Sequence, residues 1–196
     1  MDGFIALVAD LLIENGVAPT CVFRTAKRDL ALPGFFRPTK DWDLVIVHRE
    51  RLLAAAEFKS QVGSFGNNYN NRTEEALGNA TDIWTAYREG AFQKIPRPWL
   101  GFMMLLERAP GSTSPVRVRT PHFKIFAEFQ DASYAIRYQL LCQKLVAERL
   151  YDATCFMLTD QKGSYDEPIE EIGFAPFVKS LVAHVTGILR TEDEMS

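Results

Sequence analysis

The sequence is poor in the residues that mark a secreted or zinc-stabilised protein. It has three cysteines and three histidines in 196 residues, and the cysteines lie far apart, at positions 21, 142 and 155. An odd number of cysteines with this spacing fits neither a disulfide framework nor a zinc site. Because each cysteine has apolar neighbours, we expect reduced side chains in the core of a cytoplasmic protein.

Long apolar runs are also missing, and none approaches the length that spans a bilayer. No basic flank precedes the first apolar stretch, so the N-terminal residues do not indicate a signal peptide. Hydrophobic residues make up 47% and charged residues 24%, which is typical of a folded protein and not of a disordered one. We therefore predict a single domain over residues 1–196 with no membrane segment.

The net charge of −3 gives no overall positive excess, yet basic side chains gather in two stretches. Residues 21–40 hold five against one acid, and residues 94–124 hold six against one, while the acidic excess follows Asp160. A basic face on an acidic chain can bind phosphate, although ordinary solvated loops are the alternative. The basic residues are Arg24, Lys27, Arg28, Arg37 and Lys40 in the first stretch, and Lys94, Arg97, Arg108, Arg117, Arg119 and Lys124 in the second.

Hydrophobic periodicity predicts the order αβββαβ, followed by αβα. This order indicates the α/β class, with a mixed sheet flanked by helices in one layered domain. A turn is expected over residues 48–52, and a loop rich in glycine and asparagine over residues 63–71. The expected helices cover residues 2–15, 72–88, 133–151 and 177–190, and the expected strands cover 20–25, 43–47, 53–62, 99–106 and 154–159.

The hairpin predicted around residues 43–62 carries the clearest chemistry. If Asp43 pairs with Glu57, the two carboxylates share a face, with Cβ atoms about 4.5–5.5 Å apart. Carboxylates this close repel each other unless a cation lies between them. Strand alternation places Lys59 and Gln61 on the same face as Glu57. The arrangement depends on register, because a slip of one residue turns Asp43 to the other face.

Two carboxylates with no histidine or cysteine nearby favour a hard cation such as Mg²⁺ over zinc. A neighbouring lysine can stabilise negative charge, and it can position or deprotonate a water. Phosphodiester hydrolysis needs an activated water and neutralisation of the charge that grows on the phosphate. Because Glu-x-Lys arises by chance about once in a few hundred residues, surface charges on a strand are the alternative. We predict Asp43, Glu57 and Lys59 as catalytic residues, with Asp43 and Glu57 as metal ligands. Glu14 is either a further ligand or an exposed helical residue.

Side-chain amides are concentrated directly after this hairpin. Asparagine can pair with adenine and arginine with guanine in the major groove, so the segment is a candidate for DNA recognition, and a simple turn is the alternative. Basic side chains ahead of the hairpin can bind phosphate beside the cleaved bond or merely face solvent. The predicted DNA-binding residues are Arg37, Lys40, Gln61, Asn67, Asn68, Asn70, Asn71 and Arg72.

Several long segments of unusual composition resemble the XhoI family of type II restriction endonucleases. The resemblance extends to about Leu158, and the acidic tail after Asp160 has no match. Trp42 stands where a proline usually precedes the first acidic residue of the motif. The similar segments are LPGFFRPTK at 32–40, WDL at 42–44, EFKSQV at 57–62, SFGNNYNNRTEE at 64–75, WTAYREG at 84–90, PHF at 121–123 and ASY at 132–134.

The resemblance implies the PD-(D/E)xK nuclease fold and Mg²⁺-dependent cleavage of double-stranded DNA. It further implies recognition of the palindrome CTCGAG, 5′ overhangs, a homodimer that matches the symmetry of the palindrome, and a host methyltransferase that protects the same sequence. Members of the family carry an additional N-terminal segment ahead of the part that corresponds to Met1. A shortened chain is therefore expected, and dimerisation or activity can depend on that segment.

Three other functions are compatible with the residues. A repair or recombination nuclease of the same fold would recognise DNA structure, although the amides favour sequence reading. A DNA-binding relic would have lost catalysis through truncation, although the complete set of Asp43, Glu57 and Lys59 weighs against decay. A metal-independent binding module gives no reason for paired carboxylates.

Overall fold

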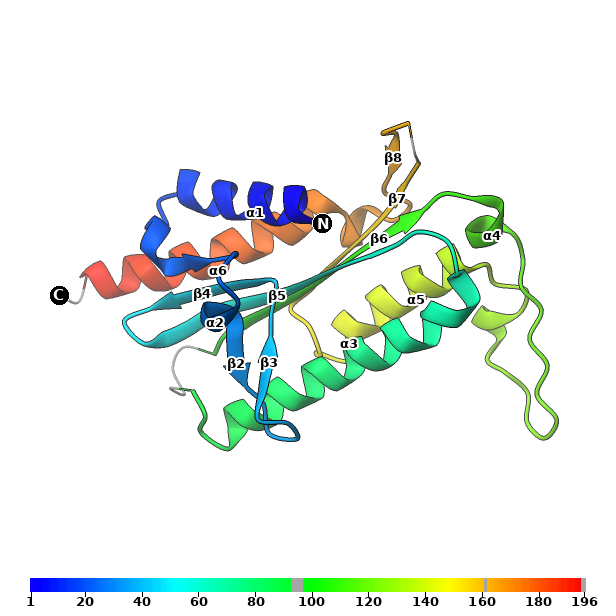
Figure 1. Ribbon diagram of the computed structural model, residues 1–196, viewed down its shortest axis with the longest axis horizontal. Coiled ribbons are helices and arrows are strands. Elements are labelled where there is room, and N and C mark those ends of the chain that lie inside the picture. Colours follow the sequence, from blue (N-terminus) through cyan, green and yellow to red (C-terminus); the bar gives the residue numbers. More distant parts are fainter. Residues whose placement is uncertain (93–96, 161, 195–196) are drawn as a thin grey trace.

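A mixed sheet forms the centre of the protein in the computed structural model, which describes residues 1–92, 97–160 and 162–194 (Figure 1). Its six strands among these residues are antiparallel at both edges, whereas the two central pairs, β5 with β6 and β6 with β7, are parallel. In spatial order the strands are β1 (Val22–Phe23), β4 (Leu44–His48), β5 (Arg51–Gln61), β6 (Trp99–Glu107), β7 (Ala153–Thr159) and β8 (Tyr165–Asp166).

Helices cover both faces of this sheet (Figure 1). One face packs against α1 (Asp2–Glu14) and α6 (Phe174–Glu194), and the other against α3 (Phe65–Arg88) and α5 (Tyr134–Ala147). The shorter elements are α2 (Lys27–Leu30), α4 (Pro110–Thr113), the 3₁₀ turns η1 (Pro19–Cys21), η2 (Ala127–Phe129) and η3 (Glu170–Ile172), and a separate hairpin of β2 (Ala31–Pro33) and β3 (Thr39–Asp41).

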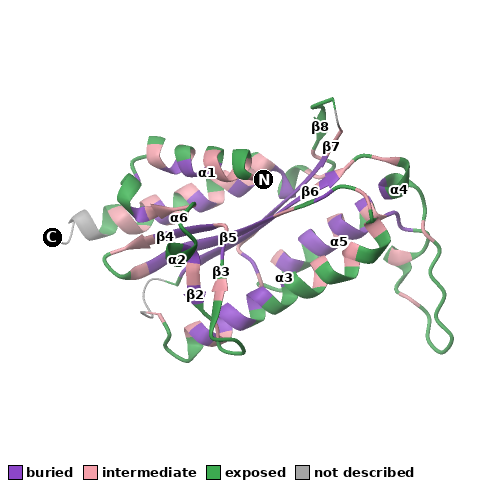
Figure 2. Ribbon diagram, in the orientation of Figure 1, coloured by how far each residue is buried: buried purple, intermediate pink, exposed green. Residues whose placement is uncertain are grey.

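The central strands are apolar on both faces because helices exclude water from both, and Figure 2 shows them as the most buried part of the chain. α3 connects β5 to β6 and α5 connects β6 to β7, which are the crossovers that parallel pairs require. The main elements therefore follow the predicted order, with the β2–β3 hairpin added between the first two predicted strands. The layered α/β architecture with a mixed sheet is confirmed.

The β4–β5 hairpin differs from its prediction in a way that preserves the predicted pairing. Instead of five residues, the turn has two, Arg49 and Glu50, with positive φ angles of 48° and 61°, as a type I′ turn requires. This turn alone would place Asp43 opposite Ala56. A bulge between Ile46 and Val47 shifts the register by one residue, so that the pairs Leu44↔Ala56 and Val45↔Ala55 continue towards Asp43 and Glu57.

The prediction of a loop over residues 63–71 was wrong, because α3 begins at Phe65. Asparagine and glycine have low helix propensity, but packing overrides it here. Phe65 and Tyr69 lie one helical turn apart and pack against the core beneath the sheet. The amides therefore project from the first turns of a helix.

The chemistry of the cysteines agrees with the sequence, since all three are buried free thiols. Among the described residues, no helix is both long and apolar enough to cross a membrane.

Candidate active site

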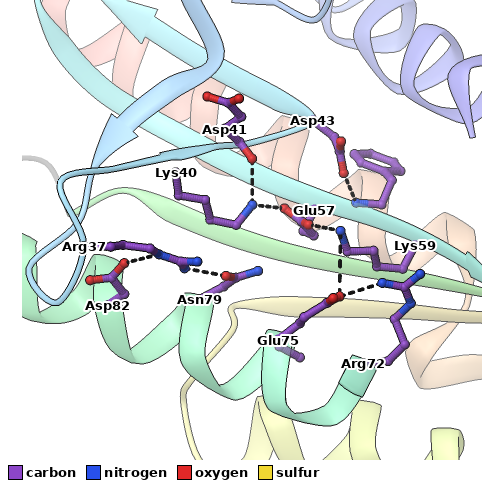
Figure 3. Close-up of polar contacts among 12 residues, drawn as sticks. Arg37, Lys40, Asp41, Asp43, Glu57, Lys59, Arg72, Glu75, Asn79 and Asp82 are labelled. Carbon is purple, nitrogen blue, oxygen red and sulfur yellow. Dashed lines mark hydrogen bonds and ion pairs between the residues drawn. The ribbon is translucent and has the colours of Figure 1, made fainter. Parts of the chain in front are cut away.

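Glu57 lies on the face of β5 that α3 covers, and it is only 3% exposed (Figure 3). Its carboxylate lies between two ammonium groups. The Nζ atom of Lys40 is 2.5 Å from Oε2, and Lys59 contacts Oε1. A buried carboxylate is unfavourable without such partners. The two lysines therefore compensate the charge of this buried carboxylate.

Lys40 comes from β3 and is turned inward, with 12% of its side chain exposed. Besides Glu57, it donates to the carbonyl oxygen of Asp41 at 2.7 Å and lies 4.5 Å from the ring centroid of Trp42. The sequence analysis placed Lys40 on DNA, whereas the structure binds it to the candidate catalytic carboxylate. The β2–β3 hairpin that brings it there was not predicted.

Asp43 follows β3 and precedes β4, one residue beyond the last pair Leu44↔Ala56, so the register extended by one residue brings it to Glu57. Its carboxylate accepts a hydrogen bond of 2.7 Å from the backbone NH of Phe58. Burial raises the pKa of Asp43, and the charge of Glu57 adds to the rise, although the hydrogen bond from Phe58 opposes it. The ionised pair of carboxylates is thus unfavourable by itself, and a cation near both would relieve the repulsion.

Two carboxylate oxygens are the donors that Mg²⁺ prefers, so the residues present fit a hard divalent cation. Within the described part of the chain, no cluster of three or more histidine, cysteine, aspartate and glutamate side chains forms a metal site. Asp43 and Glu57 would therefore supply the protein carboxylates, and the remaining ligands would be backbone carbonyl groups, waters and the substrate phosphate.

Lys59 also connects the site to α3, because its Nζ atom is 4.0 Å from Oε2 of Glu75. The same carboxylate oxygen is 2.7 Å from Nη1 of Arg72. An ionic chain thus extends from Arg72 through Glu75 and Lys59 to Glu57 (Figure 3). Sequence reasoning missed Glu75, whose only signal was its spacing of three residues from Arg72 on one helix. Arg72, predicted to contact DNA, already has an acidic partner.

Arg37 belongs to a second polar cluster, around Asp82 of α3 (Figure 3). The Asp82 carboxylate accepts hydrogen bonds from the backbone NH groups of Phe35 and Phe36, at 2.7 and 2.8 Å, and from Nε of Arg37 at 2.6 Å. Arg37 also donates to Oδ1 of Asn79 at 2.5 Å. The cluster connects the β2–β3 hairpin to α3, and the DNA contact of Arg37 stays a prediction.

The chemistry around Asp82 explains why this connection is strong. Burial by itself would raise the pKa of Asp82, but the hydrogen bonds from Phe36, Arg37 and Phe35 outweigh it and hold the pKa below its usual value. A Cβ atom at Gly34 would overlap the Asp82 carboxylate, so glycine permits the close approach of the hairpin. Because Lys40 lies on this hairpin, the cluster also fixes Lys40 beside Glu57.

Gln61 shares the face of Glu57 as predicted but lies beneath α5 and is 4% exposed. Its side-chain oxygen accepts a hydrogen bond from the hydroxyl of Tyr138, and its amide donates to the carbonyl of Gly63 at 3.3 Å. The predicted DNA contact of Gln61 was therefore wrong, because a helix that follows about 80 residues later covers this end of β5.

The remaining predicted residues lie outside the carboxylate cluster. Asn67, Asn70 and Asn71 are exposed on one face of the first turns of α3, and Asn68 is half-buried. Glu14 is exposed at the end of α1, which covers the opposite face of the sheet, so it contributes nothing to the metal site. Lys94 lies outside the described residues.

Comparisons with known proteins agree with this geometry. The family described as restriction endonuclease XhoI matches residues 1–168. The type II restriction enzyme BstVI of Geobacillus stearothermophilus is 49% identical, over 94% of this chain and 86% of that enzyme. AbrI of Azospirillum brasilense is 56% identical, over 63% of this chain and 56% of its own, and XhoI of Xanthomonas vasicola is 45% identical, over 74% and 59%. No solved structure matches the chain.

A layered α/β domain with a buried carboxylate between lysines, similar over most of its length to these enzymes, defines the class as a restriction endonuclease, a hydrolase. Within that class, the chain belongs to the XhoI family of type II restriction endonucleases. The resemblance of the sequence motifs is thereby confirmed. The chain spans a little over half of the length of AbrI and of XhoI.

Proposed function

We propose that the chain hydrolyses double-stranded DNA at the palindrome CTCGAG in a Mg²⁺-dependent reaction that leaves 5′ overhangs. The observation that carries the proposal is the register of the β4–β5 hairpin, which sets Asp43 opposite Glu57 while Lys59 contacts Glu57 on the same face. This is the set that the PD-(D/E)xK motif requires. The recognition sequence and the overhang rest on the family resemblance alone.

The side chains have distinct roles in this reaction. A divalent cation, when bound, stabilises the negative charge that grows on the phosphate and makes a nearby water a better nucleophile. Asp43 and Glu57 would hold that cation. Lys59, 24% exposed and fixed by Glu57, directs its ammonium protons to the attacking water or to a phosphate oxygen. Glu75 limits the motion of Lys59 from the side of α3.

Lys40 is the second counter-ion of Glu57. It neutralises this carboxylate within the protein and would compete with a divalent cation for the same oxygen. Its ammonium is also close enough to the site to bind a phosphate oxygen once it leaves Glu57. Mg²⁺ binding by a Lys40 variant in the absence of DNA tests the competition.

Recognition is assigned to the exposed amides of α3. Asn67, Asn70 and Asn71 share a face that no other element covers, and asparagine can read adenine in the major groove. Asn68 and Arg72, both partly buried, border that face. A palindrome has two-fold symmetry, so a homodimer would place one active site at each strand. The host would need a methyltransferase of the same specificity to protect its own DNA.

Digestion of a plasmid that contains one CTCGAG sequence tests this proposal. The wild type is compared with Lys59→Ala, each with Mg²⁺ and with a chelator. Lys179→Ala is the matched control, because this exposed lysine lies on α6, over the opposite face of the sheet. Linear DNA is expected from the wild type and the control with Mg²⁺, and uncut DNA from Lys59→Ala.

The other outcomes are equally informative. Mg²⁺-dependent cutting at other sequences would keep the nuclease and overturn the assigned specificity. Cutting by Lys59→Ala at the wild-type rate would overturn the active site. No cutting by the wild type would overturn the proposed activity of this chain, and a gel shift on the same site would then show whether a DNA-binding relic remains.

A further inference from the structure

Residues 115–126 form an extended segment that we name the arm. It leaves α4, reaches away from the body of the protein without helix or strand, and returns to η2 (Figure 1). Most of its residues are exposed (Figure 2). A segment this exposed gains little from the core, so its composition reflects what it contacts outside the chain.

The base of the arm is fixed. Arg137 of α5, which is 8% exposed, donates hydrogen bonds of 3.0 Å to the carbonyl oxygens of Val116 and Ala132. Its guanidinium group also lies 5.0 Å from the ring centroid of Tyr134. These contacts fix the start of the arm and the segment that follows η2 to α5, so that the exposed residues leave the protein at a defined place.

The arm carries positive charge without neighbouring negative charge. Arg117, Arg119 and Lys124 are exposed, and the sequence has no acidic residue between Glu107 and Glu128. None of the three cations forms an ion pair with any residue that the structure describes. The three side chains are therefore available to a ligand.

Apolar side chains alternate with these charges at the surface. Val118 is 41%, Phe123 85% and Phe126 78% exposed. Large exposed apolar side chains mark interaction sites when they are grouped. A mixture of cations and aromatic rings suits a nucleic acid, whose phosphates take the charge and whose sugars and groove walls take the rings.

The arm starts close to the first turn of α3, which carries the candidate DNA-reading amides. A Cβ atom at Gly111, just before the arm, would lie 3.0 Å from the ring of Phe65, the first residue of α3. The arm therefore leaves beside the helical turns that carry the exposed amides. The length of α3 from Asn67 through Glu75 to Asp82 is about 22 Å at the rise of an α-helix. This length equals a little more than six base-pair steps of DNA.

We propose that the arm is a DNA-binding element, with Arg117, Arg119 and Lys124 on backbone phosphates beyond the cleaved bond and Phe123 against the groove. This inference rests on the proposed function and adds a contact that the catalytic residues do not need. A second copy of the chain is the less favourable occupant, because two arms with the same charge repel each other. Phosphate contacts position the duplex and do not read its sequence.

Salt-dependent binding to a labelled duplex in the presence of chelator tests the arm. The variant Arg117→Ala/Arg119→Ala/Lys124→Ala is compared with Lys162→Ala/Lys179→Ala/Arg190→Ala, which removes the same charge from exposed positions elsewhere. Each phosphate contact contributes about 0.9 to the slope of log affinity against log salt concentration, so the arm variant is expected to lower the slope by about 2–3. The control is expected to keep the wild-type slope.

The loss of affinity is expected to be equal for duplexes with and without CTCGAG. Phe123→Ala is the second variant, and weaker binding with an unchanged slope is expected. Equal slopes for the arm variant and its control would overturn the proposal. So would a change in sedimentation without a change in slope, which would assign the arm to a second copy. If Lys59→Ala binds DNA but does not cut it while the arm variant binds like the wild type, the arm fails and the proposed function stands. Failure of the wild type to bind any duplex overturns both.

Discussion

The two faces of β5 differ sharply in their chemistry. Towards α1 and α6, the strand presents Ala54, Ala56 and Phe58, all within one apolar cluster. Towards α3, the same strand presents Glu57 and Lys59, both in ionic contacts. A strand that helices cover on both faces is normally apolar throughout. The face towards α3 departs from this rule over a single short segment.

The buried charges of β5 depend on partners of opposite charge, one of them from another segment. The buried carboxylate of Glu57 has Lys40 and Lys59 as partners of opposite charge at hydrogen-bond distance beneath α3. Apolar residues of similar size often stabilise a fold as well or better, so these charges are not explained by stability alone. Places where local rules fail while partners are provided from elsewhere are expected to be functional.

The largest effect on cleavage is expected from a substitution of Glu57, the central charged residue on the face of β5 towards α3. Glu57→Gln keeps the shape of the side chain but removes the charge that holds a cation, and cleavage should fall about 10³-fold or more. Phe58→Leu, the neighbouring residue on the apolar face, should reduce the free energy of unfolding by about 1–2 kcal/mol and leave the cleavage rate unchanged. Single-turnover cleavage and urea unfolding of both variants measure the pair of effects.

A cleavage rate of Glu57→Gln close to that of the wild type would contradict the active site. A loss of cleavage by Phe58→Leu in fully folded protein would show that the two faces are not separate in function. Circular dichroism before each assay provides the control for folding.

Features that depend on neighbouring residues in the sequence were predicted correctly more often than features that depend on distant ones. Alternation along one strand was enough to place Glu57 and Lys59 together, since period two is a local property. The bulge at Ile46 and Val47 had no local signal in the sequence. The predicted turn was too long and the bulge was not predicted, and the two errors shifted the register of Asp43 in opposite directions, so they cancelled. The asparagines at the start of α3 were predicted to lie in a loop because of their low helix propensity, whereas packing makes this segment helical in the structure.

Contacts between distant segments were beyond the reach of sequence reasoning. Asp82 accepts hydrogen bonds from residues 45–47 positions earlier, and nothing near Asp82 in the sequence indicates this. Lys40 was recognised as basic and near the site, but its contact with Glu57 depends on a hairpin that only tertiary packing forms. Gln61 was placed on the correct face and misjudged in exposure, because α5 was not placed over it.

The second effect tests how the polar face is maintained. Asp82→Ala removes the acceptor of two backbone NH groups and of Arg37, and the free energy of unfolding should fall by about 2–4 kcal/mol. Because the β2–β3 hairpin is then released from α3, Lys40 is no longer placed to bind a phosphate oxygen, and cleavage should weaken as well. Thermal unfolding and cleavage at a temperature where the variant is folded measure both effects.

Asp160→Ala is the matched control, since Asp160 also accepts two backbone hydrogen bonds, from Lys162 and Ser164, but at an exposed turn. Its expected cost is below about 1 kcal/mol. Equal stability losses for the two aspartates would mean that the hairpin holds its place without Asp82.

The smallest effect concerns competition for Glu57. Lys40→Met keeps much of the length of the side chain and its contact with Trp42 but removes the ammonium that lies 2.5 Å from Oε2. Without this charge, a divalent cation meets less repulsion, and Mg²⁺ should bind about tenfold more tightly in calorimetric titration without DNA. Lys179→Met, on the opposite face of the sheet, should bind Mg²⁺ like the wild type. Unchanged binding by Lys40→Met would mean that the cation does not use this oxygen of Glu57. Weaker binding would mean that Lys40 orients the carboxylate for the cation instead of competing with it, and Lys40 would then belong to the structural support of the site together with Asp82.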